Sequence, residues 1–285
     1  MLLCNYTQKR VDMMWDAIAY NDSRKYAFMT VNARWIHADK YFDTAAQLYS
    51  YIVQNKVSDV HVKPLDDGGG REWVVDADYK NYVDEHDLML KIYIGATAFL
   101  LFYTEENVSR VMYTGNRGFH LWLKFTDKFK ITSAQNVRVH RYKAFEKPAK
   151  LDSDCIQPGS FAHCVREAVR LYVPHMQDSN LDALTLQYWP DVDRDIFCNV
   201  NKQIRAPYSY NYKGTKFSRC ITKELLDKLK QCYPGYGIGG CGPVTTTTTT
   251  TTTTPSPPKI GSIQTTTPPS PPKIGSIQTT TKSTT

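Results

Sequence analysis

The sequence predicts an α+β domain followed by a disordered tail, and three observations support this. Segments with helically spaced apolar residues are interleaved with short runs of β-branched residues, which indicates a sheet with flanking helices. Two strand-like runs joined by TGNRG predict a hairpin. Residues 244–285 are a Thr/Pro-rich repeat with too little apolar surface to offset the entropy of ordering. We therefore expect a folded domain over residues 1–243 and a disordered low-complexity tail over 244–285.

The first part of the chain, residues 1–60, reads mostly as helix. RVDMMWDAIAYN (10–21) and FDTAAQLYSYIVQNK (42–56) both space their apolar residues helically, and Asp43 or Thr44 is a suitable cap for the second. PLDDGGG (64–70) predicts a flexible turn. REWVVDAD then predicts a strand by its β-branched content.

The middle and end of the domain alternate between strand and helix signals. The apolar run at 86–103 fits either a helix or a strand. In the hairpin at 108–125, His120 and Lys124 are expected to share one face of the second arm. Beyond it we expect four segments: a basic connector at 128–150, a helix at 160–173, short strands and turns at 191–221, and an amphipathic helix at 223–233.

Composition narrows the class of protein. The net charge is +7, of which three lysines belong to the tail, so the domain is only mildly basic. Seven scattered cysteines without a CxxC pair argue against a disulfide framework and for a reducing compartment. No signal-like apolar segment begins the chain, and the longest apolar stretch is too short to span a bilayer. We expect an intracellular protein with no membrane partner.

A pair of carboxylates follows the apolar run Trp73–Val75. Asp76 and Asp78 are two residues apart, so on a strand they point to the same face and repel one another. A hard divalent cation such as Mg²⁺ or Mn²⁺ would relieve that repulsion. The alternative is a strand that ends in a solvated turn.

Two further segments carry candidate phosphate and metal ligands. In TGNRGFH (114–120), glycines permit tight backbone geometry, and Arg117 and His120 are anion donors; the alternative is an ordinary hairpin turn. One of the three acids that precede the segment KQIRAPYS could complete a metal site. Lys202 and Arg205 of that segment could bind phosphates. The alternative is that these residues form a surface loop of mixed charge. These acids are Asp191, Asp193 and Asp195.

In this order the three segments resemble the small catalytic subunit of the archaeo-eukaryotic DNA primases. The resemblance covers residues 72–214 and is carried by the DxD after a strand, the Gly-Arg-Gly-x-His-like segment, and an acid twelve residues before a basic IRAPYS segment. It implies a primase-type two-layer catalytic core of β-sheet and flanking helices, with a helical lobe. It also implies synthesis of short RNA primers on single-stranded DNA by two-metal nucleotidyl transfer during viral DNA replication.

The resemblance assigns roles residue by residue. Asp76, Asp78 and Asp193 match the catalytic carboxylates that bind Mg²⁺ or Mn²⁺. The residues that match nucleotide-binding positions are Thr114, Arg117, His120, Arg205 and Ser209. Two positions depart from the family pattern, because Asn116 replaces a usual Arg and Asn211 a usual His.

A structural zinc is not expected between the DxD and the hairpin. Residues 78–114 contain no cysteine, and a tetrahedral zinc site needs four nitrogen or sulfur ligands. Two other groups of residues contain candidate zinc ligands, although buried or free thiols are the favoured interpretation of their cysteines. The first group is Cys155, His163 and Cys164, and the second is Cys220, Cys232 and Cys241.

The basic connector, Lys128–Lys150, interleaves cations with aromatic residues, which suits a single-stranded template. Arg138, Arg141 and Lys143 are its candidate template contacts, and a solvated linker is the alternative. The resemblance further implies ribonucleoside triphosphates as substrates, a second, primase-like accessory subunit, and, through viral members, the host cell nucleus.

Three other functions compete with primer synthesis. A polymerase of the same superfamily would extend primers without starting them, and a replication scaffold would lack activity. A hydrolase using Asp76 and Asp78 as acid and base is disfavoured, because adjacent carboxylates on one face cannot flank a scissile bond from both sides.

Overall fold

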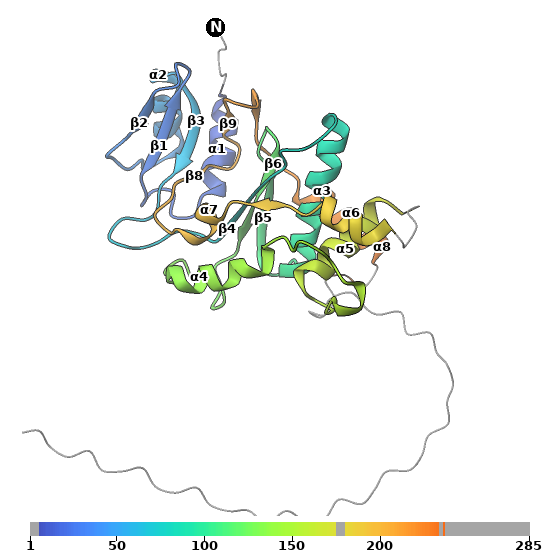
Figure 1. The fold of residues 1–285 in the computed structure, drawn as a ribbon. Helices are drawn as coiled ribbons and strands as arrows, with labels where there is room; N and C mark the ends of the chain where they lie inside the picture. The colour runs from blue at the N-terminus through green and yellow to red at the C-terminus, as the bar shows by residue number, and fades with distance from the viewer. Residues whose placement is uncertain (1–5, 175–179, 234–235, 237–285) are drawn as a thin grey trace, which may run out of the picture. The chain divides into compact units, whose positions relative to one another are not determined.

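The structure is a computed structural model that describes residues 6–174, 180–233 and 236 (Figure 1). The predicted disordered tail at 244–285 lies outside the described residues, as do Cys4 and Cys241. Within the described part the domain contains both helices and sheets, so the predicted α+β class is confirmed.

The first sheet has four strands in the order β2-β1-β3-β8, and each neighbouring pair is antiparallel. Its strands are β1 (Tyr26–Thr30), β2 (Trp35–His37), β3 (Val57–Val62) and β8 (Ile204–Arg205). Three of them come from residues 1–62, so the expectation of a mostly helical start is wrong. β1 and β3 are buried almost throughout, and neither shows the regular alternation that identifies a strand, since β3 buries Ser58 and Asp59 together with its valines.

Two helices at the start of the chain follow their predicted positions. α1 (Gln8–Ala17) begins at Thr7 and α2 (Ala45–Gln54) begins at Thr44. Each threonine hydroxyl accepts a hydrogen bond from a backbone N–H of the first turn, which satisfies one otherwise unpaired donor. Both helices pack on the cluster of apolar side chains that also includes Phe28, Val60 and Val62.

The second sheet has five strands in the order β11-β5-β6-β4-β7. These strands are β4 (Val74–Asp78), β5 (Val108–Tyr113), β6 (Gly118–Leu123), β7 (Asp191–Val192) and β11 (Arg219–Cys220). The predicted hairpin is confirmed as β5–β6, and β4 lies between β6 and β7. A separate pair is formed by β9 (Tyr210–Asn211) and β10 (Lys216–Phe217).

The apolar run at 86–103 is a helix, α3 (Glu85–Tyr103), which begins at the capping residue Asp84. It packs against the second sheet and lies beside α5, as Figure 1 shows. The other helices are α4 (Gln135–Tyr142), η1 (Lys143–Phe145), η2 (Ser153–Cys155), α5 (Phe161–Tyr172), α6 (Leu181–Gln187), α7 (Arg194–Cys198) and α8 (Thr222–Cys232). In the described part of the chain, no helix is both long and apolar enough to cross a membrane.

Strand β4 separates two hydrophobic clusters. Val75 and Ala77 face the cluster built on α3, whereas Val74 faces the cluster shared with the first sheet. Because side chains alternate along a strand, Asp76 and Asp78 continue the Val74 face. The carboxylates of Asp76 and Asp78 therefore lie at the edge of the hydrophobic cluster that β4 shares with the first sheet.

Candidate active site

The two carboxylates of β4 each meet a positively charged or ionisable partner from the hairpin. Asp76 lies opposite His120 in the strand register, with its Oδ1 3.4 Å from His120 Nε2. Asp78 Oδ2 accepts a hydrogen bond of 3.0 Å from Arg117 Nε. The side chains of Asp76 and Asp78 are 23% and 37% exposed, so both remain open to a ligand.

Glycine is required at two positions of the hairpin. A Cβ atom at Gly118 would collide with the carboxylate of Asp78 and the carbonyl oxygen of Ala77. Gly115 has φ +79°, and a Cβ there would lie 2.6 Å from the carbonyl oxygen of Lys216. Gly118 therefore lets the hairpin approach the Asp78 carboxylate closely, and Gly115 lets it approach the backbone of β10.

A hollow of about 160 Å³ opens beside the carboxylates. It is lined by Asp76, Asp78, Thr114, Asn116, Arg117, His120, Arg205, Asn211 and Lys213. Three lining residues are cations, which suits a polyanionic ligand next to the two acids. Lys213 is exposed and was missed in the sequence, where nothing sets it apart from other surface lysines.

Arg205 is fixed in this hollow by a buried acid. It forms an ion pair with Asp59 of β3, whose side chain is fully buried. The backbone N–H of Tyr212 also donates to Asp59, at 3.2 Å from Oδ2. Burial lowers the pKa of Arg205 to about 10, so the guanidinium stays charged at neutral pH. Sequence reasoning missed Asp59, because the segment VSDVHV was not predicted as a buried strand.

His61 lies directly opposite Arg205 on the neighbouring strand. Both ring nitrogens are buried and make no hydrogen bond with any described residue. Burial, followed by the charge of His120, lowers the pKa of His61 to about 3, so the ring is neutral near pH 7.

This histidine predicts a pH-dependent stability. Between pH 6.5 and about 3 the unfolded chain binds a proton at His61 that the folded chain does not. Stability is thus expected to fall as the pH drops below 6.5, by at most about 1.4 kcal/mol per pH unit from this group. Urea unfolding at pH 7 and pH 5 measures it. His61→Leu should reduce the slope, while exposed His86→Leu should leave it unchanged; equal slopes in both variants would contradict the assignment.

Asp193 lies beside Asp76. Its backbone N–H donates to the carbonyl oxygen of Asp76 at 2.8 Å, and its Oδ1 caps α7 by accepting from Ile196 N at 2.9 Å. Asp191 is instead paired with Lys80 and Asp195 with Lys202, while Asp193 forms no ion pair among the described residues.

These carboxylates have the chemistry to bind a hard divalent cation, because oxygen ligands are what Mg²⁺ and Mn²⁺ prefer. Within the described ranges, no three His, Cys, Asp or Glu side chains already form a metal-binding group. The roles of Asp76, Asp78 and Asp193 as metal ligands stay predictions.

Of the other predicted nucleotide contacts, Thr114 lines the hollow and Ser209 does not. The Thr114 hydroxyl donates to the carbonyl oxygen of Gly118 at 3.0 Å. Ser209 is fully buried, and its hydroxyl accepts from Val60 N at 2.8 Å. A direct contact between Ser209 and a nucleotide is therefore corrected to a structural role that ties its loop to β3.

The predicted template contacts are scattered. Arg138 is fully buried, lies 4.3 Å from the Trp73 ring centre, and donates to the carbonyl oxygen of Arg71 at 2.6 Å. Its predicted template contact is therefore wrong, because the guanidinium is sealed inside the fold. Arg141 lines a separate hollow of about 440 Å³, and Lys143 is exposed. Neither belongs to the hollow beside Asp76.

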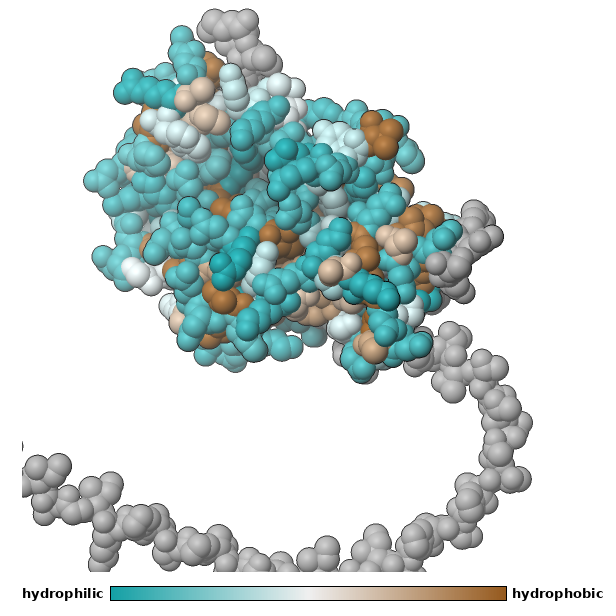
Figure 2. Space-filling model, in the orientation of Figure 1, coloured by the Kyte–Doolittle hydropathy of each residue, from teal (hydrophilic) through white to brown (hydrophobic). Residues whose placement is uncertain are grey.

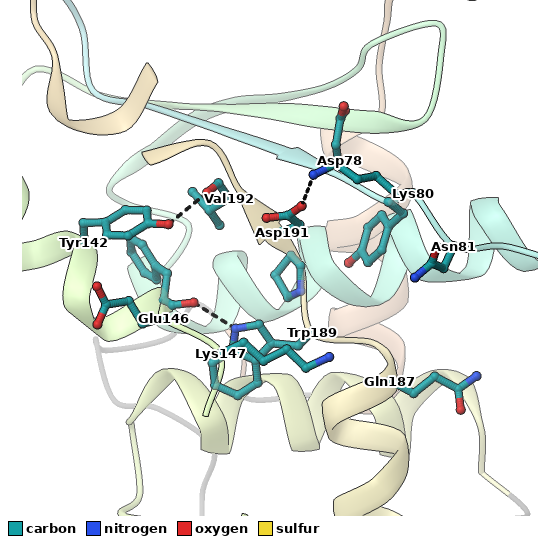
Figure 3. Close-up of a pocket in the computed structure, with 13 residues that line it drawn as sticks. Asp78, Lys80, Asn81, Tyr142, Glu146, Lys147, Gln187, Trp189, Asp191 and Val192 are labelled. Carbon is teal, nitrogen blue, oxygen red and sulfur yellow. Dashed lines mark hydrogen bonds and ion pairs between the residues drawn. The ribbon is translucent and has the colours of Figure 1, made fainter. Parts of the chain in front are cut away.

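Another hollow of about 320 Å³ lies at the edge of β7 (Figure 3). Its lining includes the Lys80–Asp191 ion pair and Tyr142, whose hydroxyl donates to the carbonyl oxygen of Val192 at 3.0 Å. Asp78 borders it, but its carboxylate points away from the side chains gathered there. The hollow that holds both acids is therefore the candidate active site.

Comparison with known proteins identifies the family. A DNA primase of Autographa californica nuclear polyhedrosis virus is 95% identical over 264 residues, covering 93% of this chain and 97% of that protein. Late expression factor 1 of Orgyia pseudotsugata multicapsid polyhedrosis virus is 57% identical over 247 residues, covering 86% of this chain and all of that protein (100%). The chain belongs to the family of baculovirus DNA primases that includes late expression factor 1.

Two further comparisons add less. No family model matches the chain. Among solved structures, the polymerase domain from Mycobacterium tuberculosis Ligase D in complex with DNA is similar at a TM-score of 0.44 and 16% identity, covering 78% of this chain and 83% of that one.

Proposed function

We propose that the chain is the catalytic subunit of a DNA primase that makes short RNA primers on single-stranded DNA. One observation carries the proposal. Asp76 and Asp78 share a hollow with Arg117, His120, Arg205 and Lys213, so acids suited to a metal ion and cations suited to a triphosphate lie side by side. Membership of the primase family supports the same activity.

In this proposal the chain's cations bind the triphosphate of the incoming ribonucleotide. Arg205 is held in place by Asp59, whereas Arg117 is exposed enough to exchange Asp78 for a phosphate. His120 stays beside Asp76 and offers a further hydrogen bond. Together these groups offset the negative charge that develops during nucleotidyl transfer.

Asp76, Asp78 and Asp193 would hold Mg²⁺ or Mn²⁺. When bound, two such ions lower the pKa of the attacking 3′-hydroxyl and stabilise the departing pyrophosphate. The protein then needs no general base of its own. The proposal also includes a primase-like accessory subunit, late expression factor two, and action in the host cell nucleus, both of which the family resemblance implies.

The test is primer synthesis with no primer supplied. Single-stranded DNA, labelled ribonucleotides and Mg²⁺ or Mn²⁺ are incubated with the chain, with and without the accessory subunit. Short labelled products are expected. Extension of a supplied primer without de novo products would identify a primer-extending polymerase, and neither product would identify a non-catalytic scaffold.

A further inference from the structure

One face of the first sheet forms a wall that ends at Arg205 of the active site. In the antiparallel register Ala27 is paired with both His37 and His61, and His61 is paired with Arg205. Directly paired residues share a face. This face therefore runs from β2 at the sheet edge to Arg205 in the catalytic hollow, while the opposite face lies in the core.

Trp35 provides an exposed aromatic surface on this wall. Its residue is 40% exposed, although indole rings are usually covered. The ring lies nearly parallel to His37, at 16° and 6.1 Å between centroids, and meets the edge of His61 at 5.0 Å. Ala27 of β1 lies between β2 and β3, and its side chain is only a methyl group. The rings of Trp35 and His61 can therefore meet above it. Trp35 thus contacts His61, which is paired in the sheet with Arg205 of the hollow.

The charge beside these rings is positive. Exposed Arg34 precedes Trp35, and partly buried Lys63 follows β3; neither forms an ion pair with a described residue. Of the acids nearby, Asp59 pairs with Arg205, whereas Asp39 and Asp66 share Lys25. Lys63 also lies close enough to Asp39 and Asp66 to help lower the pKa of both carboxyl groups. Exposed Arg34 is therefore the unpaired cation that an anionic ligand would meet next to this stacking surface.

We propose that this face is the track for the single-stranded DNA template, with a base stacked on Trp35 and a backbone phosphate near Arg34. Single-strand binding proteins combine aromatic platforms with cations in this way. Three strand spacings of about 4.8 Å separate β2 from β8, so a base on Trp35 lies roughly 14 Å from Arg205, within a few nucleotides of the reacting centre. The assignment rests on the proposed function, because it takes the ligand to be a template.

Binding of labelled single-stranded oligothymidine, with EDTA and without nucleotides, tests the proposal independently of catalysis. Trp35→Ala is expected to weaken binding about 5- to 100-fold, the usual effect of removing one stacking ring. Trp35→Phe should restore most of the affinity. Tyr82→Ala is the matched control, since Tyr82 is 45% exposed and lies in the loop before α3; it should bind like the unaltered chain.

Unchanged DNA affinity in a folded Trp35→Ala variant would overturn the proposal. A raised ribonucleotide KM with unchanged DNA affinity would also overturn it, by assigning the ring to the incoming base. If circular dichroism shows that Trp35→Ala does not fold, Arg34→Glu tests the proposal instead. The proposal requires that this variant bind the oligothymidine more weakly and that its affinity depend less steeply on salt concentration. Trp35-dependent DNA binding without primer synthesis would instead refute only the proposed function.

Discussion

Replacement of Asp76 by Asn is expected to lower primer synthesis by about 10³-fold or more. The change keeps the size of the side chain but removes one of the two charges that face the hollow on β4. Metal ions contribute several kcal/mol of transition-state stabilisation, and each 1.36 kcal/mol is a factor of ten in rate. The measurement is the initial rate of labelled primer formation at saturating Mg²⁺ and again at saturating Mn²⁺.

Asp191→Asn is the matched control for this variant. Asp191 is the same residue type on the strand next to β4, but its partner is exposed Lys80, and such surface pairs contribute little. We expect this control to retain a rate within about threefold of the unaltered chain. If Asp76→Asn and Asp191→Asn were equally active, Asp76 would not be a metal ligand in the reaction.

Replacement of Arg205 by Ala is expected to destabilise the fold by about 3–5 kcal/mol as well as impair nucleotide binding. The change leaves Asp59 as a buried carboxylate without its cation, which is among the most costly single alterations in a protein interior. Urea unfolding measures the free energy, and ribonucleotide KM at a permissive temperature measures binding.

The double variant Asp59→Asn, Arg205→Ala separates these two effects. Removing both charges should recover most of the stability, because no buried charge is left unpaired. The ribonucleotide KM should stay raised, since the cation in the hollow is still missing. A double variant as unstable as Arg205→Ala would contradict the role of Asp59 as the residue that holds Arg205.

Local features of the fold could be predicted from the sequence. Thr44 caps its helix, the glycine-containing turn joins β5 to β6, and Asp76 and Asp78 lie on a strand, because each depends on neighbouring residues. β1 and β3 could not be predicted, since β1 is apolar on two faces and β3 buries Ser58 and Asp59 among its valines, so neither alternates regularly.

Burial explains where the site predictions failed. Arg138 and Ser209 have polar side chains, so their residue types suggest surface contacts, yet both form hydrogen bonds inside the fold. Asp59 could not be linked to Arg205, because spacing along the chain does not reveal which strands become neighbours. Matching to a family motif placed Arg205 in the hollow but gave no information on what holds it there.

The position of β8 also affects the order in which a newly made chain can become active. Arg205 and Asp59 are 146 residues apart, yet they meet on adjacent strands. While the ribosome is still making the residues between them, β3 is an unpaired sheet edge, which is prone to pairing with other chains. A chain terminated before residue 205 would lack both the strand that closes this edge and a cation of the hollow. Premature products of translation should therefore be inert and prone to aggregation, rather than partly active competitors for template.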